Sequence, residues 1–438
     1  MAVTGSATPV AWPCRLAPPH SRRTGRLTES VSFIVRRLAR SVSESAGFRV
    51  ETWSVDSQTA TSAAAKITSP LRREWALLLS FITTALFLLF GKSWMAHLAQ
   101  PLWFSFILAW LFCMIVASAF AVVRHAESLA VIFGEPSGTL ILTLSAITIE
   151  VMMIAAVMLT GDSKPALARD TMFAVLMIIL NGMVGLSLLL GGLRYHEQTY
   201  NFYGANAFLG LIVPLAVLGL VLPNYTTASA GPTFSPFQAV FLAVMCVGLY
   251  GIFVASQTSR YREYFITPGA SREEAAKEVG HHHANMKIRS APYHSVLLVL
   301  YLLPIALLAK QLAVPLDYGV RVIAAPQALG GLLVAAVILS PESMSAVRAA
   351  MANQMQRAVN ILLGTALSTI GLTIPAVLTL GLVTGKTVVL GLEVVEMIML
   401  LLTLAVSTLT FTGNRTNFVQ GAIHLLLFLA YLTLIFER

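Results

Sequence analysis

Two glutamates, Glu150 and Glu342, lie inside long apolar runs of this sequence, and each follows a glycine by twelve residues. The first run is Gly138-Thr-Leu-Ile-Leu-Thr-Leu-Ser-Ala-Ile-Thr-Ile-Glu150, and the second is Gly330-Gly-Leu-Leu-Val-Ala-Ala-Val-Ile-Leu-Ser-Pro-Glu342. Twelve helical residues rise about 18 Å. If the runs cross a bilayer, each carboxyl group therefore lies near the middle of a hydrocarbon core about 30 Å thick.

An ionisable side chain at that depth costs about 2.5 to 3.5 kcal/mol and persists only when it is paired, protonated or facing an aqueous cavity. Two facing carboxylates among carbonyl, hydroxyl and amide oxygens are the hard ligands that Ca²⁺ prefers, and Na⁺ could use the same oxygens. Without a cation, two desolvated carboxylates bind protons instead. The pair therefore predicts competition between cation and proton, whereas a purely structural role would not explain two acids at matching positions.

The composition indicates a membrane protein. The chain has 438 residues, of which 57% are hydrophobic and 11% are charged, whereas a soluble domain carries about 25% charged residues. This excludes a water-soluble globular protein, a disordered chain and a coiled coil. The 29 Lys and Arg lie mostly in short loops between apolar runs, so they indicate membrane topology rather than a nucleic-acid partner. The three cysteines are far apart and form neither a disulfide framework nor a metal motif.

Apolar runs of bilayer length follow one another from Glu74 to the end. Because only helices and closed barrels satisfy backbone groups in lipid, we predict an all-α, polytopic membrane protein with about eleven transmembrane helices. The predicted spans are residues 75–90, 102–123, 137–159, 171–190, 207–222, 237–255, 295–308, 329–351, 358–382, 388–409 and 422–435.

Positive charge predicts the orientation. The loop at 259–293 holds six Lys and Arg, and Arg72 and Arg73 precede the first span. An even number of predicted crossings separates the two segments, so both lie on one side, which the positive-inside rule makes cytoplasmic. We therefore expect a cytoplasmic N-terminus.

The chain divides into four parts. Residues 1–73 are rich in Arg, Ser and Thr, and we expect a disordered tail or an overlong start. Residues 74–258 and 294–438 form two transmembrane halves. The cytoplasmic loop 259–293 between them contains His281-His-His283, which could bind a metal or sense pH, although a solvated loop is the simpler interpretation.

The two glutamate-containing runs predict inverted repeats. They fall in the third and eighth spans, which cross the membrane in opposite directions. Inverted repeats place a transporter's substrate site at the repeat interface near the midplane. We expect the helices to open at residues 145–148 and at Pro341, where they would offer backbone carbonyls. The spans that follow carry amides and hydroxyls, namely Asn181 in the first repeat and Asn360, Thr365 and Ser368 in the second.

Other charged positions have smaller predicted roles. Glu135 precedes Pro136 and could cap the next helix or line a cation entry. Glu393 and Glu396 lie three apart on one helical face, and we expect an interfacial pair at the outer mouth. His424 is expected to be a hydrogen-bonded packing residue.

Several motifs resemble a known family. Ala126-Glu-Ser-Leu-Ala-Val-Ile-Phe-Gly-Glu-Pro-Ser-Gly138, leading to Glu150, resembles the first alpha repeat of the calcium/cation antiporter superfamily in its cation/proton exchanger branch. Pro341-Glu342, residues 352–365 and Thr373-Ile-Pro375 resemble the second. The runs 134–144, 169–171 and 413–417 are similar to the bacterial ChaA type of sodium(potassium)/proton and calcium/proton antiporter.

The resemblance covers the chain from about residue 75 onward. It implies one helix outside two inverted five-helix halves, and cation export driven by proton entry, in the inner membrane of a bacterium. By resemblance, Glu150 and Glu342 are the metal- and proton-binding glutamates. Polar supporting positions would be Thr148, Asn181, Ser340, Thr365 and Ser368.

The family pattern Gly-Asn-Ala-x-Glu is not retained. Ala146-Ile-Thr-Ile149 precedes Glu150, and Ile338-Leu-Ser-Pro341 precedes Glu342. The missing asparagines remove amide ligands, which disfavours tight Ca²⁺ selectivity and leaves room for Na⁺ or K⁺.

We therefore predict a secondary antiporter exchanging Ca²⁺, Na⁺ or K⁺ for protons, with no resident cofactor and no partners beyond these ions and the bilayer. The oligomeric state stays open. A passive cation channel with an acidic constriction is the alternative. An intramembrane enzyme is disfavoured because the sequence has no His-Glu-x-x-His motif and no Gly-x-Ser-x-Gly elbow. The absence of a P-loop argues against a self-contained ATP-driven pump.

Overall fold

The computed structural model describes residues 74–134, 137–158, 165–269, 289–326 and 328–436. The predictions for residues 1–73, for Glu135 and for His281 to His283 lie outside these ranges.

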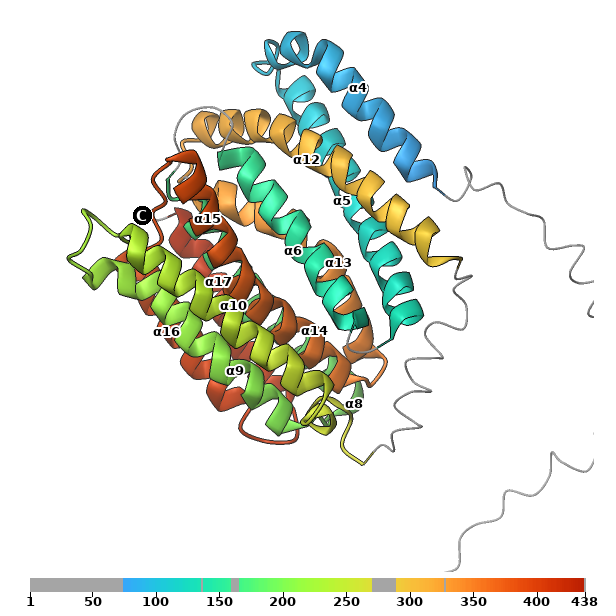
Figure 1. The fold of residues 1–438 in the computed structure, drawn as a ribbon, viewed down its shortest axis with the longest axis vertical. Coiled ribbons are helices and arrows are strands. Elements are labelled where there is room, and N and C mark those ends of the chain that lie inside the picture. The colour runs from blue at the N-terminus through green and yellow to red at the C-terminus, as the bar shows by residue number, and fades with distance from the viewer. Residues whose placement is uncertain (1–73, 135–136, 159–164, 270–288, 327, 437–438) are drawn as a thin grey trace, which may run out of the picture. The chain divides into compact units, whose positions relative to one another are not determined.

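The described chain is helical (Figure 1). Its long helices are α4 (Trp75–Met95), α5 (Pro101–Phe133), α6 (Ser137–Met158), α10 (Pro236–Thr258), α12 (Ala291–Val322), α13 (Ala328–Met351), α16 (Val394–Thr410) and α17 (Phe418–Phe436). Three further spans are composite: α7 (Leu167–Leu176), η1 (Met177–Met183) and α8 (Val184–Tyr195); α9 (Phe202–Ala216), η2 (Val217–Val221) and η3 (Leu222–Tyr225); and α14 (Met355–Ser368), η5 (Thr369–Thr373) and α15 (Ile374–Thr384). A short 3₁₀ turn, η4 (Arg262–Phe265), follows α10.

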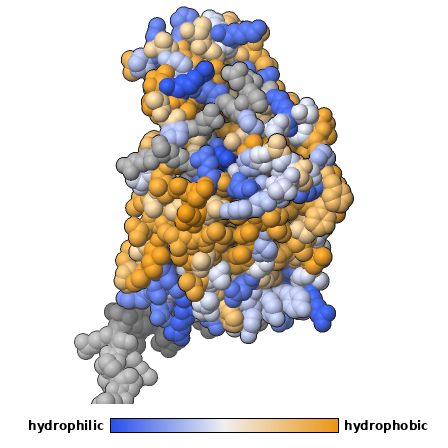
Figure 2. Space-filling view, turned by 90° about the vertical axis from the view of Figure 1, so that its left-hand side faces the viewer, coloured by the Kyte–Doolittle hydropathy of each residue, from blue (hydrophilic) through white to orange (hydrophobic). Residues whose placement is uncertain are grey.

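Within the described ranges, ten helical spans are long and apolar enough to cross a membrane, and α16 is a shorter apolar helix of 17 residues. This confirms the predicted all-α membrane fold of about eleven spans. Large apolar side chains point outward, with Leu89 76% and Phe237 81% exposed. The face in Figure 2 carries hydrophobic residues across its middle, as expected where lipid replaces water.

Three predicted boundaries were wrong. Helices α5 and α12 extend well beyond their apolar runs, to 33 and 32 residues, because polar residues near their ends hide the continuing helix from a hydropathy criterion. Helix α16 begins at Val394 instead of residue 388, because Glu393 caps it and the preceding segment is extended. Backbone bonds such as Val389 N to Pro165 O, 2.9 Å, hold that segment.

The expected openings at residues 145–148 and at Pro341 are absent, since α6 and α13 are continuous helices through both sites. Pro341 removes the backbone donor for the Val337 carbonyl four residues earlier. The Ser340 hydroxyl donates to that same carbonyl at 2.8 Å, so a side chain replaces the missing bond and the helix continues.

Irregular backbone lies instead in the helices that follow. The π-helical segments η1 and η5 begin at Met177 and Thr369. Thr369 lies 192 positions after Met177, the same separation as between Glu150 and Glu342. The repeat relation therefore includes the π-helical backbone, a feature frequent at functional sites.

Helices α5 and α12, the first helices of the two repeats, pack side by side, and α4 packs against both (Figure 1). These three helices share one hydrophobic cluster, and the remaining helices form a second. Helices α6 and α13 contribute to both: Ile149 and Val337 belong to the first cluster, and Ile154 and Leu339 to the second. The helices that carry Glu150 and Glu342 therefore lie where the two clusters meet.

The two membrane faces can be distinguished by their contacts. The start of α4 meets the end of α5 and the start of α12 around Glu74, and we call this side the Glu74 face. On the opposite side, Lys386 Nζ donates to Met158 O at the end of α6, at 2.9 Å. We call that side the Lys386 face.

Candidate functional site

Glu150 lies deep in the protein on α6, with 4% of its surface exposed. One carboxylate oxygen, Oε2, accepts a hydrogen bond of 3.0 Å from the Thr369 hydroxyl in the π-helix η5 of the other repeat. Thr373, one turn further along, faces the same carboxyl group without a hydrogen bond of ordinary geometry. The other oxygen, Oε1, is buried and has no hydrogen-bond partner among the described residues.

Glu342 lies on α13, which packs against α6. Its Oε2 atom is also buried without a hydrogen-bond partner in the described part of the chain. The Glu342 carboxyl group is close enough to Glu150 to repel it electrostatically. The structure therefore brings together the two glutamates that the sequence singled out, one from each repeat.

A third acid acts on this pair. Glu127, on α5, exerts an electrostatic repulsion on Glu342. Its position adds negative charge between the pair and the Glu74 face. Sequence reasoning missed this role, although an acid inside a long apolar helix was a usable signal.

Thr369 was missed as well. Its only sequence signal was indirect, because Thr369 and Thr373 lie four apart in a span rich in hydroxyls. A π-helical turn changes which side chains face the neighbouring helix, and it cannot be inferred from hydropathy.

Four hydroxyl-bearing residues predicted to support the site donate hydrogen bonds within their own helices. Their acceptors are backbone carbonyls three or four residues earlier: Leu144 for Thr148, Val337 for Ser340, Ile361 for Thr365 and Thr365 for Ser368. Each hydroxyl has therefore used its proton, and only its lone pairs remain for a cation. Their participation in cation binding stays a prediction.

Asn181 is fully buried in η1, and its hydrogen bonds to other helices reach α16 and α17. Its Nδ2 donates to Thr403 Oγ1 at 2.8 Å, and its Oδ1 lies 3.4 Å from His424 Nδ1. His424 Nε2 lies 2.9 Å from Thr410 Oγ1. These bonds tie the π-helix to two neighbouring helices, consistent with the packing role expected of His424, and a direct role of Asn181 in cation binding stays a prediction.

The oxygen chemistry suits a cation held briefly. Within the described ranges, no group of three or more His, Cys, Asp or Glu is arranged to hold a metal ion. The site instead offers two unpartnered carboxylate oxygens and nearby hydroxyls, which are hard ligands.

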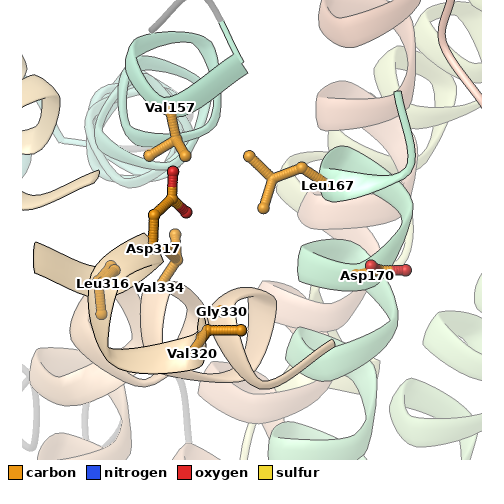
Figure 3. A pocket seen from close by; sticks show the side chains of 8 residues that line it. All are labelled: Val157, Leu167, Asp170, Leu316, Asp317, Val320, Gly330 and Val334. Carbon is orange, nitrogen blue, oxygen red and sulfur yellow. The ribbon is translucent and has the colours of Figure 1, made fainter. Parts of the chain in front are cut away.

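A small cavity is lined by side chains of α6, α7, α12 and α13 (Figure 3). It has a volume of about 40 Å³, room for a few waters or one ion. Val157 and Val334 in its wall are about two helical turns from the glutamates on the Lys386 side. Asp317 points into the cavity, and Asp170 lies at its edge (Figure 3).

The expected Glu393 and Glu396 pair lies at the Lys386 face. Together they form the capping box that begins α16. The Arg169 guanidinium lies 3.9 Å from Glu393 and 4.0 Å from Glu396, and it pairs with Asp170 at 2.8 Å. These acids therefore belong to a network around Arg169 in which Arg169, Asp170 and Glu396 are buried and Glu393 is exposed.

Known proteins are similar to this chain over most of its length. The protein-family model described as "Sodium/calcium exchanger protein" matches residues 103–259 and 293–437. The protein y4hA of Sinorhizobium fredii is 42% identical over 322 residues, covering 73% of this chain and 86% of the relative. The sodium-potassium/proton antiporter ChaA of Escherichia coli is 39% identical over 322 residues, covering 74% and 86%.

Two solved structures share the fold. The structure of native YfkE has a TM-score of 0.62 and 17% identity, covering 83% of this chain and 100% of that chain. The H⁺/Ca²⁺ exchanger CAX has a TM-score of 0.59 and 16% identity, covering 82% and 88%. At this identity the likeness concerns the fold alone.

Proposed function

The chain belongs to the sodium/calcium exchanger family, and from that premise we propose that it exports Na⁺, K⁺ or Ca²⁺ from the cytoplasm in exchange for protons. Family membership makes it an integral membrane transporter rather than an enzyme. The observation that carries the proposal is the pair of buried, unpartnered carboxylate oxygens on Glu150 and Glu342, contributed by two different repeats.

In this proposal, the burial of Glu150 and Glu342 couples the movement of the cation to that of protons. Two ionised carboxylates with unpartnered oxygens are too costly to carry between the membrane faces, because each lacks compensation inside a low-dielectric interior. One Ca²⁺, two monovalent cations, or one monovalent cation together with one proton neutralises the pair, and two protons do the same. The repeats can therefore change access while either cargo is bound, but not while the site is empty, and this makes exchange obligatory. No resident cofactor is needed for such a cycle.

The ligand count favours monovalent cargo. Ca²⁺ takes six to eight oxygens, whereas this site offers two carboxylates and the Thr369 hydroxyl, with no amide immediately before either glutamate. The relative ChaA of Escherichia coli is named a sodium-potassium/proton antiporter. We therefore rank Na⁺ and K⁺ above Ca²⁺ as substrates.

The Glu74 face is assigned to the cytoplasm. Helix ends at that face carry twice as many described basic residues as the ends at the Lys386 face, which the positive-inside rule associates with the cytoplasmic side. Arg124, Arg194, Arg260, Arg262, Arg289, Arg348, Arg357 and Arg415 lie at the Glu74 face, and Lys92, Arg169, Arg321 and Lys386 lie at the other. We place the protein in a bacterial inner membrane on the basis of its relatives.

Purified protein in liposomes tests the proposal. A proton gradient is imposed, and luminal pH is followed while Na⁺, K⁺ or Ca²⁺ is added in turn. We expect cation-dependent proton movement, which falls to background in Glu150→Gln and in Glu342→Gln. Glu263→Gln, at an exposed acid in η4, is the matched control and should transport normally.

Two results would overturn the proposal. Normal transport by either central variant would refute the site. Cation flux without proton movement would indicate a passive channel and refute antiport.

A further inference from the structure

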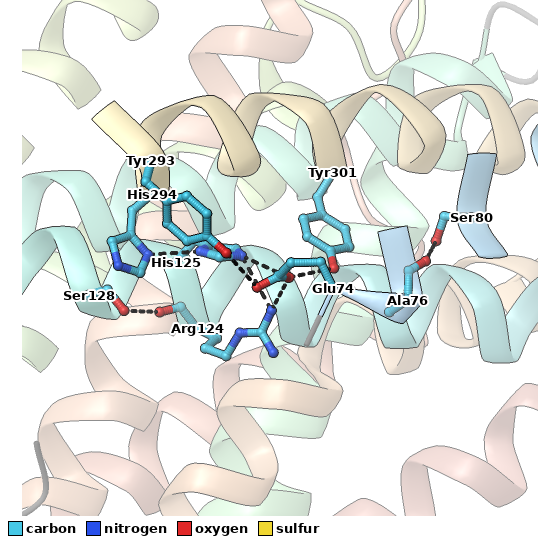
Figure 4. A network of polar contacts seen from close by, with 9 residues as sticks. All are labelled: Glu74, Ala76, Ser80, Arg124, His125, Ser128, Tyr293, His294 and Tyr301. Carbon is cyan, nitrogen blue, oxygen red and sulfur yellow. Dashed lines mark hydrogen bonds and ion pairs between the residues drawn. The ribbon is translucent and has the colours of Figure 1, made fainter. Parts of the chain in front are cut away.

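A second buried polar network lies at the Glu74 face, apart from the cation site (Figure 4). It joins three helices through Glu74 just before α4, His125 on α5, and His294 and Tyr301 on α12. His125 is 1% exposed, His294 5% and Glu74 6%. Ionisable groups this deeply buried need specific partners, so the direction of each hydrogen bond matters.

Glu74 is the fixed negative charge of this network. Its carboxylate accepts hydrogen bonds from the Arg124 guanidinium and from the hydroxyls of Tyr293 and Tyr301, at 3.2 Å and 3.0 Å. Burial raises the pKa of Glu74, but the His125 hydrogen bond, the Arg124 charge and the Tyr301 hydrogen bond outweigh it and hold that pKa below its usual range. Glu74 therefore stays ionised near neutral pH.

The hydrogen bonds fix the protonation of both histidines. The Arg289 backbone N–H donates to His294 Nε2 at 3.2 Å, so a neutral His294 carries its proton on Nδ1. That proton points at His125 Nδ1, 2.9 Å away. His125 must then carry its own proton on Nε2, which faces Glu74 Oε2 at 3.4 Å. One donor therefore faces one acceptor at every step from Arg289 to Glu74.

The reverse assignment fails at Arg289. The Arg124 Nη2 atom lies 3.3 Å from His125 Nε2, and it could donate there only if His125 held its proton on Nδ1. His294 would then hold its proton on Nε2, directly against the Arg289 N–H. Only the first assignment satisfies that backbone donor.

An added proton breaks this chain of hydrogen bonds. A histidinium donates from both ring nitrogens. A charged His294 would place its Nε2–H donor opposite the Arg289 N–H donor. A charged His125 would place its Nδ1–H donor opposite the Nδ1–H donor of His294. Both rings must therefore be neutral for the hydrogen bond between His125 and His294 to form.

Among the described residues, charged and titratable groups lie near the histidines on several elements, including Glu127 on α5. Around the histidines lie Glu74 of the segment before α4, Arg124 of α5, Tyr293 and Tyr301 of α12, and Arg289, whose guanidinium lies 4.7 Å from the centre of the Tyr293 ring. Helices α6 and α13, which also pack against α5, carry Glu150, Glu342 and Arg348.

We propose that the His125–His294 pair is a proton-sensing tie, which holds the ends of α5 and α12 together when both rings are neutral and releases them when a proton binds from the Glu74 side. Helices α5 and α12 are the first helices of the two repeats, and transporters of inverted repeats switch access by moving one repeat or bundle against the other. The effect on transport rests on the proposed function. The effect on structure does not.

Hydrogen–deuterium exchange of residues 291–301 tests the tie in the full-length protein. At about pH 8, we expect exchange in the double variant His125→Asn/His294→Asn to be about fivefold faster than in the wild type, the equivalent of one lost hydrogen bond. At about pH 5, the lower end of the range in which histidine titrates, the two proteins should exchange alike. Comparison at equal pH cancels the intrinsic rates, and His196→Asn, at an exposed histidine on the same face, should match the wild type throughout.

If the double variant exchanged faster than the wild type by the same factor at both pH values, the contact would be merely structural and the proposal would be overturned. Equal exchange rates of the two proteins at both pH values would also overturn it. The ¹⁵N spectrum of histidine-labelled wild type gives an independent test, should the double variant not fold. At about pH 8, His294 must be the Nδ1–H tautomer and His125 the Nε2–H tautomer. The opposite tautomers, or a charged ring, would overturn the proposal. Because neither readout needs transport, loss of the tie and failure of antiport are separable.

Discussion

The hydroxyl of Thr369 is the most direct test of how the site chooses between cation and proton. It donates to Glu150 Oε2 at 3.0 Å in a fully buried setting. A donor of this kind stabilises the ionised carboxylate, the form that binds a cation, more than the protonated form, whose carbonyl oxygen accepts only a weaker neutral hydrogen bond. Thr369→Val keeps the shape of the side chain and removes only this interaction.

The magnitude follows from the chemistry of the bond. A hydrogen bond to a charged group is stronger than one to a neutral group by about 1 to 1.5 kcal/mol, which corresponds to about 5-fold to about 10-fold in an equilibrium constant. At fixed pH, the apparent affinity of Thr369→Val for its cation should fall by that factor, because protons now compete better. More alkaline buffer should restore much of the loss.

The assay is cation-dependent proton flux in liposomes, measured as a function of cation concentration at several pH values. Thr369→Ser, which keeps the hydroxyl, should stay near the wild type. Thr365→Val is the matched control, because that hydroxyl donates to the Ile361 carbonyl of its own helix at 2.8 Å. If Thr369→Val and Thr365→Val gave the same affinity, the reasoning about Glu150 would be refuted.

Two further predictions concern stability, measured by thermal unfolding in detergent. Ser340→Ala should lower the free energy of unfolding by about 1 to 3 kcal/mol, because it leaves the buried Val337 carbonyl unsatisfied. This loss should largely disappear when Pro341 is also replaced by Ala. An equal loss in both backgrounds would contradict the role of the Ser340 hydroxyl. Gly185→Ala should also lower the free energy of unfolding, by about 1 to 3 kcal/mol, through overpacking. The added Cβ would lie 2.9 Å from Leu425 N and 3.0 Å from Gly421 O of α17. Gly210→Ala, where a Cβ meets nothing within 4 Å, is the control, and equal stability of both glycine variants would refute the close-packing argument.

Glu150 and Glu342 could be found from the sequence because the sequence of a membrane protein indicates how deep each residue lies in the bilayer. An apolar run fixes a span, and the number of residues from its end fixes how deep a side chain lies. Glu150 and Glu342 therefore stood out without any tertiary information. The same logic gave the number of helices, since lipid leaves the backbone no other way to satisfy its polar groups.

The partners of the glutamates could not be found in that way. Thr369 bonds Glu150 across 219 positions of sequence. It lies in a π-helical turn, which the periodicity of the sequence does not predict. His125 and His294 are 169 positions apart. Their contact arises because α5 and α12 continue as helices past their apolar runs. Both histidines lie in these continuations, which a hydropathy criterion leaves out of the predicted spans.

The expectation of opened helices failed for an instructive reason. Proline removes one donor, but a serine immediately before it can supply another, as Ser340 does for Val337. The site then has fewer free carbonyls than a broken helix would provide. Fewer carbonyls and no adjacent amides leave few oxygens for a divalent cation, which is the physical basis for ranking Na⁺ and K⁺ first.

The two glutamates are not equivalent, although the repeats that carry them are. The position 192 residues before Thr369 is Met177, so one repeat offers a hydroxyl donor and the other offers a thioether. Glu150 therefore has a partner that favours its ionised form, and the buried Oε2 of Glu342 has none among the described residues. Both Gln variants should lose exchange, but Glu342→Gln, which retains Glu150 with its donor, should bind the cation more tightly than Glu150→Gln in an equilibrium titration. Equal residual binding would mean that the Thr369 bond does not bias the site, and the asymmetry would then lie in the backbone alone.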